Sequence, residues 1–355
     1  MRPVRTACLF VLALAAIPDV GHAHEVCDLP PRHGVSAQAA AIVRSACREH
    51  LLWRRPFIDA DGRLASLGVT EAERVRLDAG DQPAWQRVAM YWRDGGTLQP
   101  MASEGTPGAA SCLAPHGERA TDSDCRAFLI DTPWSAAFVS WVMRDAGLTT
   151  FTRSARHMDY IARAYRTPPT GPYRFADPAQ EKAAPGDLLC HLRGAGPVRG
   201  GSGLRAALDG QSPAAWQSHC DIVVAANPGG DRLLYLIGGN VLNAVTMRKL
   251  PLDRSGRLQP EVFALPGATT GYPDGSGMED LDTTECRPGN AAGCSFNRRD
   301  WAALLKLQDM PPSTPEPTTS AEHAAPASAP ATLEPTTLPA PVPTASDVPG
   351  SIRPR

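Results

Sequence analysis

The chain has 355 residues, and its 35 Lys and Arg nearly balance its 37 Asp and Glu, which gives a net charge of −2 at pH 7. This balance excludes the strongly basic surface with which nucleic-acid-binding proteins release counterions from phosphates. After the N-terminal residues, no apolar run is long enough to span a membrane. We therefore expect a protein with no nucleic-acid partner and no membrane span, and we expect a monomer without a cofactor.

The N-terminus has the pattern of a secretory signal peptide. Arg2 and Arg5 precede an apolar run over residues 7–17, which is too short to span a bilayer. Small residues end this segment at Ala23, where a signal peptidase would cut. The sequence therefore predicts that residues 1–23 are removed and that the mature protein is periplasmic or secreted.

Cysteine usage also favours export. The chain has nine cysteines, and Cys8 leaves with the predicted signal peptide. The even number that remains is typical of disulfides in an exported chain, and the absence of a CxxC pair argues against a zinc or redox site. Connectivity does not follow from the sequence alone. The pairs that we expect are Cys112 with Cys125, Cys286 with Cys294, and Cys190 with Cys220, the last as a buried pair or a disulfide.

Four segments have the periodicity of amphipathic helices. The third of them follows Thr132, a candidate cap, has Pro133 in its first turn and ends at Gly147. The predicted helices cover residues 36–52, 82–93, 133–146 and 155–165.

Short apolar segments after these helices predict strands. A Pro-Gly-Gly-Asp turn at residues 228–231 separates two of them and indicates a hairpin. The Gly-rich residues 194–218 predict a long surface loop. Helices followed by an antiparallel sheet are typical of the α+β class. The predicted strands cover residues 186–192, 221–226, 232–237 and 241–250.

Composition divides the mature chain in two. Residues 24–310 are long enough for one globular domain with a helical N-terminal extension. Residues 311–355 consist mainly of Pro, Thr, Ala and Ser, so they cannot bury enough apolar surface to offset the entropy of ordering. We expect a disordered tail, either a spacer across the cell wall or an inert extension.

Ser135 is the candidate nucleophile. It shares one face of its predicted helix with Phe138, Val139 and Val142, so its hydroxyl points at the body of the protein from the first turn. Unpaired N–H groups at a helix N-terminus stabilise negative charge on a substrate oxygen. A serine also needs a nearby base, because its proton is hard to remove. The alternative is a first-turn serine that only bonds local backbone groups.

A base and an orienting group are found on the predicted strands. His219 opens one strand and would act as the general base. Asn240 follows two glycines at the end of the next strand, where its amide would orient the imidazole. The alternatives are a structural histidine and an ordinary turn asparagine.

Other residues near these segments are weaker candidates. Trp134 and His157 are candidates for substrate contact, although His157 could instead be a solvated or capping residue of its predicted helix. His191, His219 and Asp221 could in principle ligate zinc. Their spacing matches no closed structural site, so we expect no metal.

These stretches together resemble the papain-like cell-wall hydrolases, which include the CHAP amidases and the NlpC-type endopeptidases. With two stretches further upstream they also resemble an uncharacterised bacterial family, domain of unknown function 2272, over about residues 36–250. The sequence differs from that of these hydrolases at Ser135, where they have a cysteine. The matching stretches are Trp134 to Val139, Gly186-Asp187, His219 to Ile222 and Gly238 to Asn240, with Trp85 to Val88 and Tyr91-Trp92 upstream.

The resemblance implies a papain-like core in which Ser135, His219 and Asn240 form a catalytic triad. It further implies an amidase or endopeptidase that acts on peptidoglycan or another glycopeptide of the cell envelope. Because the thiol is missing, the alternative is an inactive pseudoenzyme that binds the same ligand in the same cleft. A structural module held by disulfides is a third alternative.

Overall fold

The computed structural model describes most of the region that was predicted to fold. The predicted signal peptide (1–23), the predicted tail (311–355) and Cys286 of one predicted disulfide lie outside the described residues. In the described part, no helix is both long and apolar enough to cross a bilayer. The described residues are 25–30, 34–71, 76–78, 82–114, 116–167, 170–193, 199–210, 216–264, 288–289 and 294–309.

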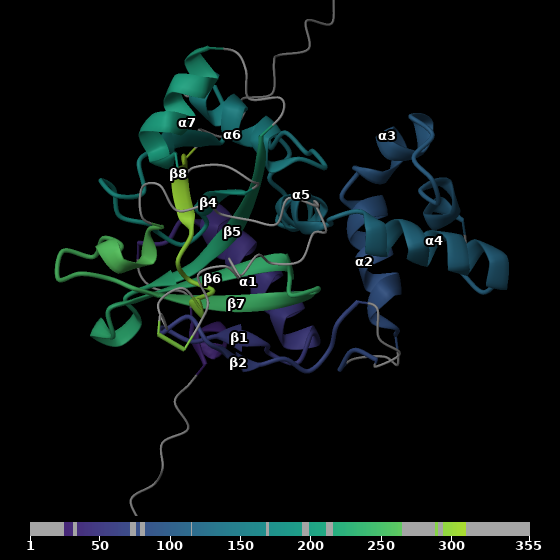
Figure 1. Cartoon of the computed structure of the whole chain (residues 1–355), viewed down its shortest axis with the longest axis horizontal. Coiled ribbons are helices and arrows are strands. Elements are labelled where there is room, and N and C mark those ends of the chain that lie inside the picture. The colour runs from purple at the N-terminus through teal and green to yellow at the C-terminus, as the bar shows by residue number, and fades with distance from the viewer. Residues whose placement is uncertain are drawn as a thin grey trace, which may run out of the picture. The chain divides into compact units, whose positions relative to one another are not determined.

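The helices confirm the four predicted segments within a few residues and add others (Figure 1). The α-helices are α1 (Ala37–Leu52), α2 (Ala84–Asp94), α3 (Leu98–Ser103), α4 (Arg119–Asp131), α5 (Ser135–Asp145), α6 (His157–Arg166) and α7 (Gly200–Asp209). Short 3-10 helices are η1 (Val26–Asp28), η2 (Ala110–Leu113), η4 (Pro228–Gly230) and η5 (Pro260–Val262). The predicted helices correspond to α1, α2, α5 and α6.

Helix α7 lies within residues 194–218, where the sequence predicted a surface loop, so that prediction is wrong for residues 200–209. Leu204 and Leu208 are one helical turn apart and both are buried. Their apolar face is enough to fold the segment onto β8 (Asp300–Leu307), although the glycines at its start have low helix propensity.

The start of α5 also differs from the prediction. Thr132 follows α4 with an extended backbone (φ −121°, ψ 112°) and does not cap α5. Pro133 disfavours a helical residue before it, so α4 ends here and the next helix begins after the proline. Ser135 is the first residue of α5, which confirms its predicted place in the first turn.

The described residues form one eight-stranded mixed sheet, which confirms the α+β class. The strands are β1 (Phe57–Ile58), β2 (Leu64–Ser66), β3 (Tyr173–Ala176), β4 (Leu188–Arg193), β5 (Gln217–Ala226), β6 (Leu233–Val241), β7 (Ala244–Pro251) and β8 (Asp300–Leu307). Their order is β2-β1-β7-β6-β5-β4-β8-β3, and neighbours are antiparallel except β1 and β7. Strands β4 to β7 correspond to the four predicted strands.

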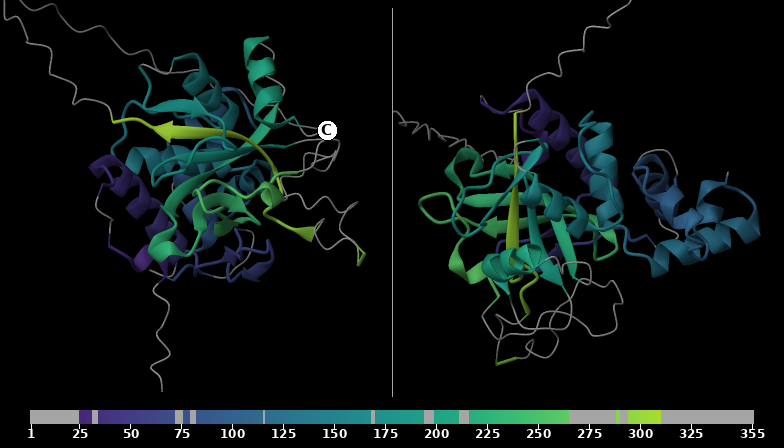
Figure 2. Two further views of the ribbon diagram at one scale, coloured as in Figure 1. Left: turned by 90° about the vertical axis from the view of Figure 1, so that its left-hand side faces the viewer. Right: turned by 90° about the horizontal axis from the view of Figure 1, so that it is seen from above.

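The sheet is strongly curled. Three strands separate β7 from β8, so in a flat sheet these two would lie about 19 Å apart, at about 4.8 Å per strand. Yet the guanidinium carbon of Arg248 on β7 lies 5.9 Å from the ring centre of Trp301 on β8. Arg248 also donates to the backbone carbonyl of Phe296, just before β8. The ribbon views show the twisted sheet from two further sides (Figure 2). On the concave side, called the inner face below, the curl brings Arg248 of β7 to Trp301 of β8.

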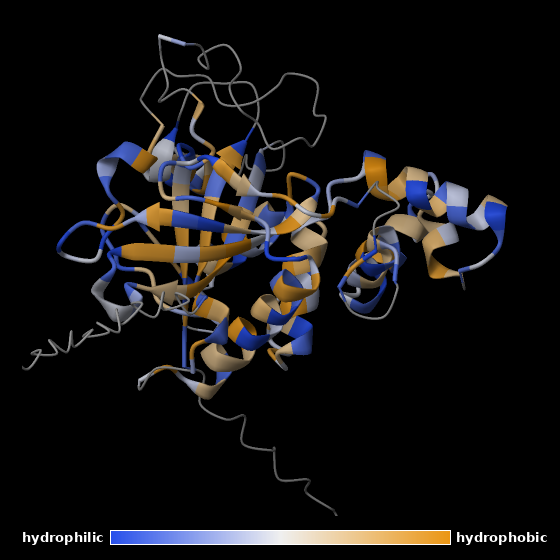
Figure 3. Cartoon of the chain, turned by 90° about the horizontal axis from the view of Figure 1, so that it is seen from below, coloured by the Kyte–Doolittle hydropathy of each residue, from blue (hydrophilic) through white to orange (hydrophobic). Residues whose placement is uncertain are grey.

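Two apolar clusters cover the two faces of the sheet. Helices α1, α5 and α6 pack on the outer face, where Ile42, Phe138 and Ile161 are buried in a cluster with Ile222 of β5. A smaller cluster lies on the inner face around Leu236 and Trp301. The hydropathy colouring shows apolar residues gathered in the strands and in the helices beside them (Figure 3). Since both faces are covered, polar groups within the sheet are buried.

Three disulfides join described cysteines. Cys112–Cys125 and Cys190–Cys220 confirm two predicted pairs, and Cys27–Cys47 joins η1 to α1. The Cys190–Cys220 bond links directly opposite residues of β4 and β5. Disulfides persist in oxidising compartments, so these bonds fit an exported protein.

Candidate functional site

Ser135 contacts a histidine, but not the predicted one. Its residue is only 4% exposed, and Phe138 and Val139 on the same helix face are fully buried. This apolar face fixes the direction of the serine side chain. The hydroxyl oxygen lies 2.7 Å from Nε2 of His157. The serine is therefore bonded to an imidazole at a helix end whose first N–H groups have no intrahelical partner.

His157 is the first residue of α6 and is held on both ring nitrogens. Its Nδ1 contacts the hydroxyl of Tyr160, one turn further along α6. Burial lowers the pKa of His157 well below its ordinary value of 6.5, and the charges of His219 and Arg193 lower it further. The ring is therefore neutral at neutral pH. If Nδ1 donates its proton to Tyr160, Nε2 is free to accept the proton of Ser135.

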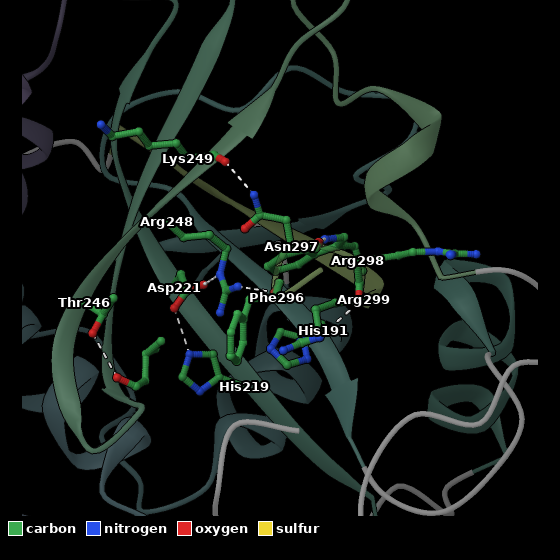
Figure 4. A network of polar contacts seen from close by, with 12 residues as sticks. His191, His219, Asp221, Thr246, Arg248, Lys249, Phe296, Asn297, Arg298 and Arg299 are labelled. Carbon is green, nitrogen blue, oxygen red and sulfur yellow. Dashed lines mark hydrogen bonds and ion pairs between the residues drawn. The ribbon is translucent and has the colours of Figure 1, made fainter. Parts of the chain in front are cut away.

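A second buried group of polar side chains contains His219. Its Nε2 lies 2.8 Å from Oδ1 of Asp221, and Oδ2 of Asp221 lies 3.2 Å from Nε of Arg248 (Figure 4). All three side chains are at most 1% exposed. His219 and Asp221 are two residues apart on β5, so they point to the same side of the strand. The Asp221 carboxylate is thus bonded to an imidazole on one oxygen and to a guanidinium on the other.

Three histidine rings form a row that begins at Ser135. The ring centres of His157 and His219 are 5.3 Å apart, and those of His219 and His191 are also 5.3 Å apart. His191 lies opposite His219 in the β4–β5 register, and its ring meets Trp301 edge-on at 5.0 Å. Burial lowers the pKa of His191 well below its ordinary value. The row connects the nucleophile candidate to the inner face of the curled sheet.

Two glycines of β6 make this arrangement possible. A Cβ at Gly238 would lie 1.9 Å from Oδ1 of Asp221 and 3.0 Å from Nε2 of His219. A Cβ at Gly239 would lie 2.4 Å from the ring of Phe138 on α5. Both positions therefore require glycine for steric reasons, since strand β6 passes directly over the histidine–aspartate pair and over the first turn of α5.

The predicted triad is not assembled as the sequence suggested. The hydrogen bonds among the described residues link Ser135 to His157 and not to His219. Asp221, rather than Asn240, bonds the His219 ring. Asn240 has a left-handed backbone (φ 59°) in β6, where the pairing with β7 is irregular, and its Oδ1 is buried without a hydrogen-bond partner in the described structure. The physical reason is the strand period, which places Asp221 on the same side as His219.

Trp134, the other predicted substrate contact, lies in the core. It is fully buried, and its ring stacks on Trp53 and Tyr91 with ring centres 5.7 Å apart in each case. Its Nε1 donates to the Glu71 carboxyl group. Burial raises the pKa of Glu71 to about 8. The structure thus gives Trp134 a packing position next to Ser135 rather than an exposed one.

The histidine cluster does not have the arrangement of a metal centre. Among the residues that the structure describes, no three His, Cys, Asp or Glu side chains are placed to hold a metal ion. Within the alternative zinc set of His191, His219 and Asp221, the His219 ring is bonded to the Asp221 carboxylate itself.

The sequence reasoning did not name Arg248, and it named Asp221 only as a possible zinc ligand. The contact of Asp221 with His219 could have been predicted from their spacing, because residues i and i+2 of a strand share a face. Arg248 lies on β7, 27 residues from Asp221, and no local pattern singles it out. His157 was named from the sequence, but its bond to Ser135 arises from the packing of α6 beside α5.

Comparison with known proteins gives a family but no relative of known structure. Residues 79–307 match the family described as "Uncharacterized protein conserved in bacteria (DUF2272)". No curated protein and no solved structure matches the chain significantly. The matched region covers more than half of the chain and contains Ser135, His157, His219 and Asp221. The chain therefore belongs to this family of uncharacterised bacterial proteins.

Proposed function

We propose that this protein is an exported hydrolase of amide or ester bonds, with Ser135 as the nucleophile and His157 as the general base. The observation that carries this proposal is the 2.7 Å contact between the Ser135 hydroxyl and Nε2 of a buried histidine. A serine needs a base in contact with it during attack, and a histidine that is neutral at neutral pH can act as that base.

The start of α5 supports the next step of the reaction. Attack on a carbonyl carbon places negative charge on the substrate oxygen. The free N–H groups of the first turn and the positive end of the helix dipole stabilise such a charge. Ser135 is the first residue of α5, so its hydroxyl is adjacent to these groups.

The proposed substrate class is the peptide of peptidoglycan or a related glycopeptide of the cell envelope, and the proposed core is papain-like. The support is the order of the segments, because a nucleophile helix (α5) precedes a strand with a histidine (β5) and a glycine-containing neighbour (β6). Helix α5 packs against both strands. An exported protein with disulfides would also meet this substrate.

The test is digestion of purified cell walls, with release of soluble peptide or new amino groups as the readout. We expect turnover by the wild-type protein and a loss of at least about 100-fold in both Ser135→Ala and His157→Gln, the range for removal of a nucleophile or base. Phe151→Leu is a matched control within the same core, since the ring of Phe151 packs on those of Tyr160 and Tyr173. Equal rates in the wild type and Ser135→Ala would refute the proposal.

A second candidate is a binding protein without turnover. The observation that favours it is the burial of Ser135 and His157, which are each 4% exposed and leave little surface for a substrate atom. Co-sedimentation with purified cell walls distinguishes the two functions. Binding that survives Ser135→Ala, with no released product from the wild type or from Ser135→Cys, would support the second candidate.

A further inference from the structure

We propose that Asn240 is a substrate-binding residue whose side-chain oxygen accepts an N–H group of the acyl part of a peptide substrate. This inference rests on the proposed function of the same site and adds the substrate group that Asn240 recognises. It gives Asn240 a contact with the substrate in place of the contact with an imidazole that the sequence predicted.

Asn240 lies beside the first turn of α5. The preceding residue, Gly239, is so close to that helix that a Cβ there would be 2.4 Å from the ring of Phe138. Phe138 is one turn after Ser135 and lies on the same face of the helix. The end of β6 that carries Asn240 therefore borders the site of the proposed nucleophile.

The backbone at Asn240 departs from that of a regular strand. Gly238 of β6 pairs with Thr246 of β7. The next pair joins Val241 to Ala244, so β6 advances by three residues while β7 advances by two. The extra residue makes a β-bulge, a feature that is common beside active sites and that changes the direction of a side chain. The φ of 59° at Asn240 is a conformation that glycine and asparagine adopt more readily than other residues.

The hairpin turn between β6 and β7 does not account for this bulge. The two strands are joined by Leu242 and Asn243, which both have a positive φ (55° and 57°), as the commonest two-residue hairpin turn requires. The turn is thus complete without Asn240, which lies two residues before it. A further left-handed residue has a cost that the turn does not need, and such costs are typical of functional sites.

The side-chain oxygen of Asn240 is an acceptor without a donor. The residue is only 4% exposed, and its Oδ1 has no hydrogen-bond partner in the described part of the protein. Most buried polar atoms are bonded, because an unsatisfied one has lost its bonds to water without replacement. An amide oxygen accepts from an N–H or O–H group. A peptide substrate has N–H groups next to the bond that the proposed nucleophile attacks, so its backbone amide is the group that fits.

The consequence is selectivity for acyl groups that carry an N–H. A substrate with this group satisfies the Asn240 oxygen when it binds. An analogue with an oxygen at the same position has no donor, and it places a second acceptor against the Asn240 oxygen. A site with a buried polar group discriminates strongly against a substrate that leaves this group unpaired.

The experiment compares two substrates that differ in this one group. The p-nitrophenyl ester of N-acetylalanine carries the N–H, and the p-nitrophenyl ester of 2-acetoxypropanoic acid has an oxygen in its place. Both enantiomers of each are assayed by release of p-nitrophenolate from the full-length mature protein. The readout is the ratio of kcat/KM for the two substrates within one protein, so partial loss of folded protein cancels.

The variants separate the side-chain oxygen from the backbone. Asn240→Gly removes the side chain and keeps the left-handed backbone, which glycine adopts without strain. Asn240→Asp keeps an acceptor oxygen in the same place. Asn243→Gly is the matched control, because Asn243 has nearly the same φ (57°) in the same hairpin but is only half-buried. Ser135→Ala removes the proposed nucleophile.

We expect the wild type to prefer the substrate with the N–H by at least about tenfold and Asn240→Gly to prefer it by less than about threefold. Asn240→Asp and Asn243→Gly should keep most of the wild-type preference. A structural role for Asn240 would instead lower both rates alike and leave the ratio unchanged.

An unchanged ratio in Asn240→Gly, or a wild-type ratio near one, would overturn the role of Asn240 but leave the proposed function intact. Loss of the preference in Asn240→Asp would also overturn it, since the amide nitrogen and not the oxygen would then make the contact. Rates that do not depend on Ser135 would overturn the proposed function, and this inference with it.

If Asn240→Gly does not fold, Asn240→Leu provides a second variant. Leucine has about the shape of asparagine without its polar atoms, and Leu242 shows that this hairpin accommodates a leucine with a φ of 55°. The expected result is the same loss of preference. A wild-type ratio in Asn240→Leu, in a protein with native circular dichroism, would contradict the inference.

Discussion

Replacement of Gly238 by alanine tests whether β6 holds the His219–Asp221 pair together. The added Cβ would lie 1.9 Å from Oδ1 of Asp221 and 2.8 Å from a methyl carbon of Val241. Ordinary contact begins near 3.4 Å, so the carboxylate oxygen would have to retreat by about 1.5 Å. The bond of 2.8 Å between Asp221 and His219 cannot survive a displacement of that size.

The magnitude follows from two contributions. Overpacking at a buried position destabilises a protein by about 1–3 kcal/mol. Loss of a buried hydrogen bond that leaves a polar partner unsatisfied destabilises it by about 1–3 kcal/mol more. We therefore expect Gly238→Ala to lower the free energy of unfolding by about 2–6 kcal/mol. At about 2–4 °C per kcal/mol for a domain of this size, that corresponds to a fall in melting temperature of roughly 4–24 °C.

The assay is thermal unfolding by calorimetry, with Gly68→Ala as the matched control. A Cβ at Gly68 would meet only the flexible side chain of Arg54, at 3.5 Å or more. The control should change stability by less than about 1 kcal/mol in either direction. A Gly238→Ala protein as stable as Gly68→Ala would refute the close approach of β6 to the histidine–aspartate pair.

Three further predictions concern groups around the site. The pKa of Glu71 is about 8 in the folded state against an ordinary 4.5, so the folded state binds a proton that the unfolded state has lost between these pH values. The contribution of Glu71 to stability should therefore be full below pH 4.5 and fall by up to about 5 kcal/mol as the pH rises to 8. Glu71→Gln should flatten this pH dependence, measured by urea unfolding at several pH values. The double variant Cys190→Ala, Cys220→Ala should lose about 3–4 kcal/mol, measured by urea unfolding, because the disulfide closes a loop across 30 residues. Tyr160→Phe should lower the hydrolysis rate by about tenfold with little change in melting temperature, because the Nδ1 proton of His157 then loses its acceptor.

The helices and strands that could be predicted from the sequence are those with a regular spacing of apolar residues or with clear turns between them. Helices α1 and α5 have large apolar residues at helical spacing, although α5 is buried on all sides from Ser135 to Met143, and strands β5 to β7 are separated by recognisable turns. Strand β8 was missed because Trp301 to Leu305 form a continuous apolar run, which is buried on both faces and does not alternate. Helix α4 was missed because only Cys125, Phe128 and Leu129 are buried, while Ile130 beside them is exposed.

The site could be predicted in its parts but not in its connections. Ser135, His157 and His219 were all named from the sequence, yet the bond from Ser135 runs to a histidine 22 residues away on another helix. No local sequence pattern predicts this contact, since it depends on how α5 and α6 pack. The resemblance to cysteine hydrolases favoured His219, on a strand, as the general base over His157, on a helix. The two glycines before Asn240 similarly favoured it as the group that orients the imidazole, although Asp221 is bonded to the His219 ring.

The proposed role of Ser135 as the nucleophile gives a physical reason for its contact with a neutral histidine. A cysteine beside a histidine exists as a thiolate before the substrate arrives, so the proton is already on the imidazole when attack begins. A serine keeps its proton until attack, and it therefore needs a neutral ring in contact with its hydroxyl. His157 meets that need, because burial and the neighbouring charges hold its pKa low. His219 instead bonds the Asp221 carboxylate on its own strand, although its ring centre is only 5.3 Å from that of His157.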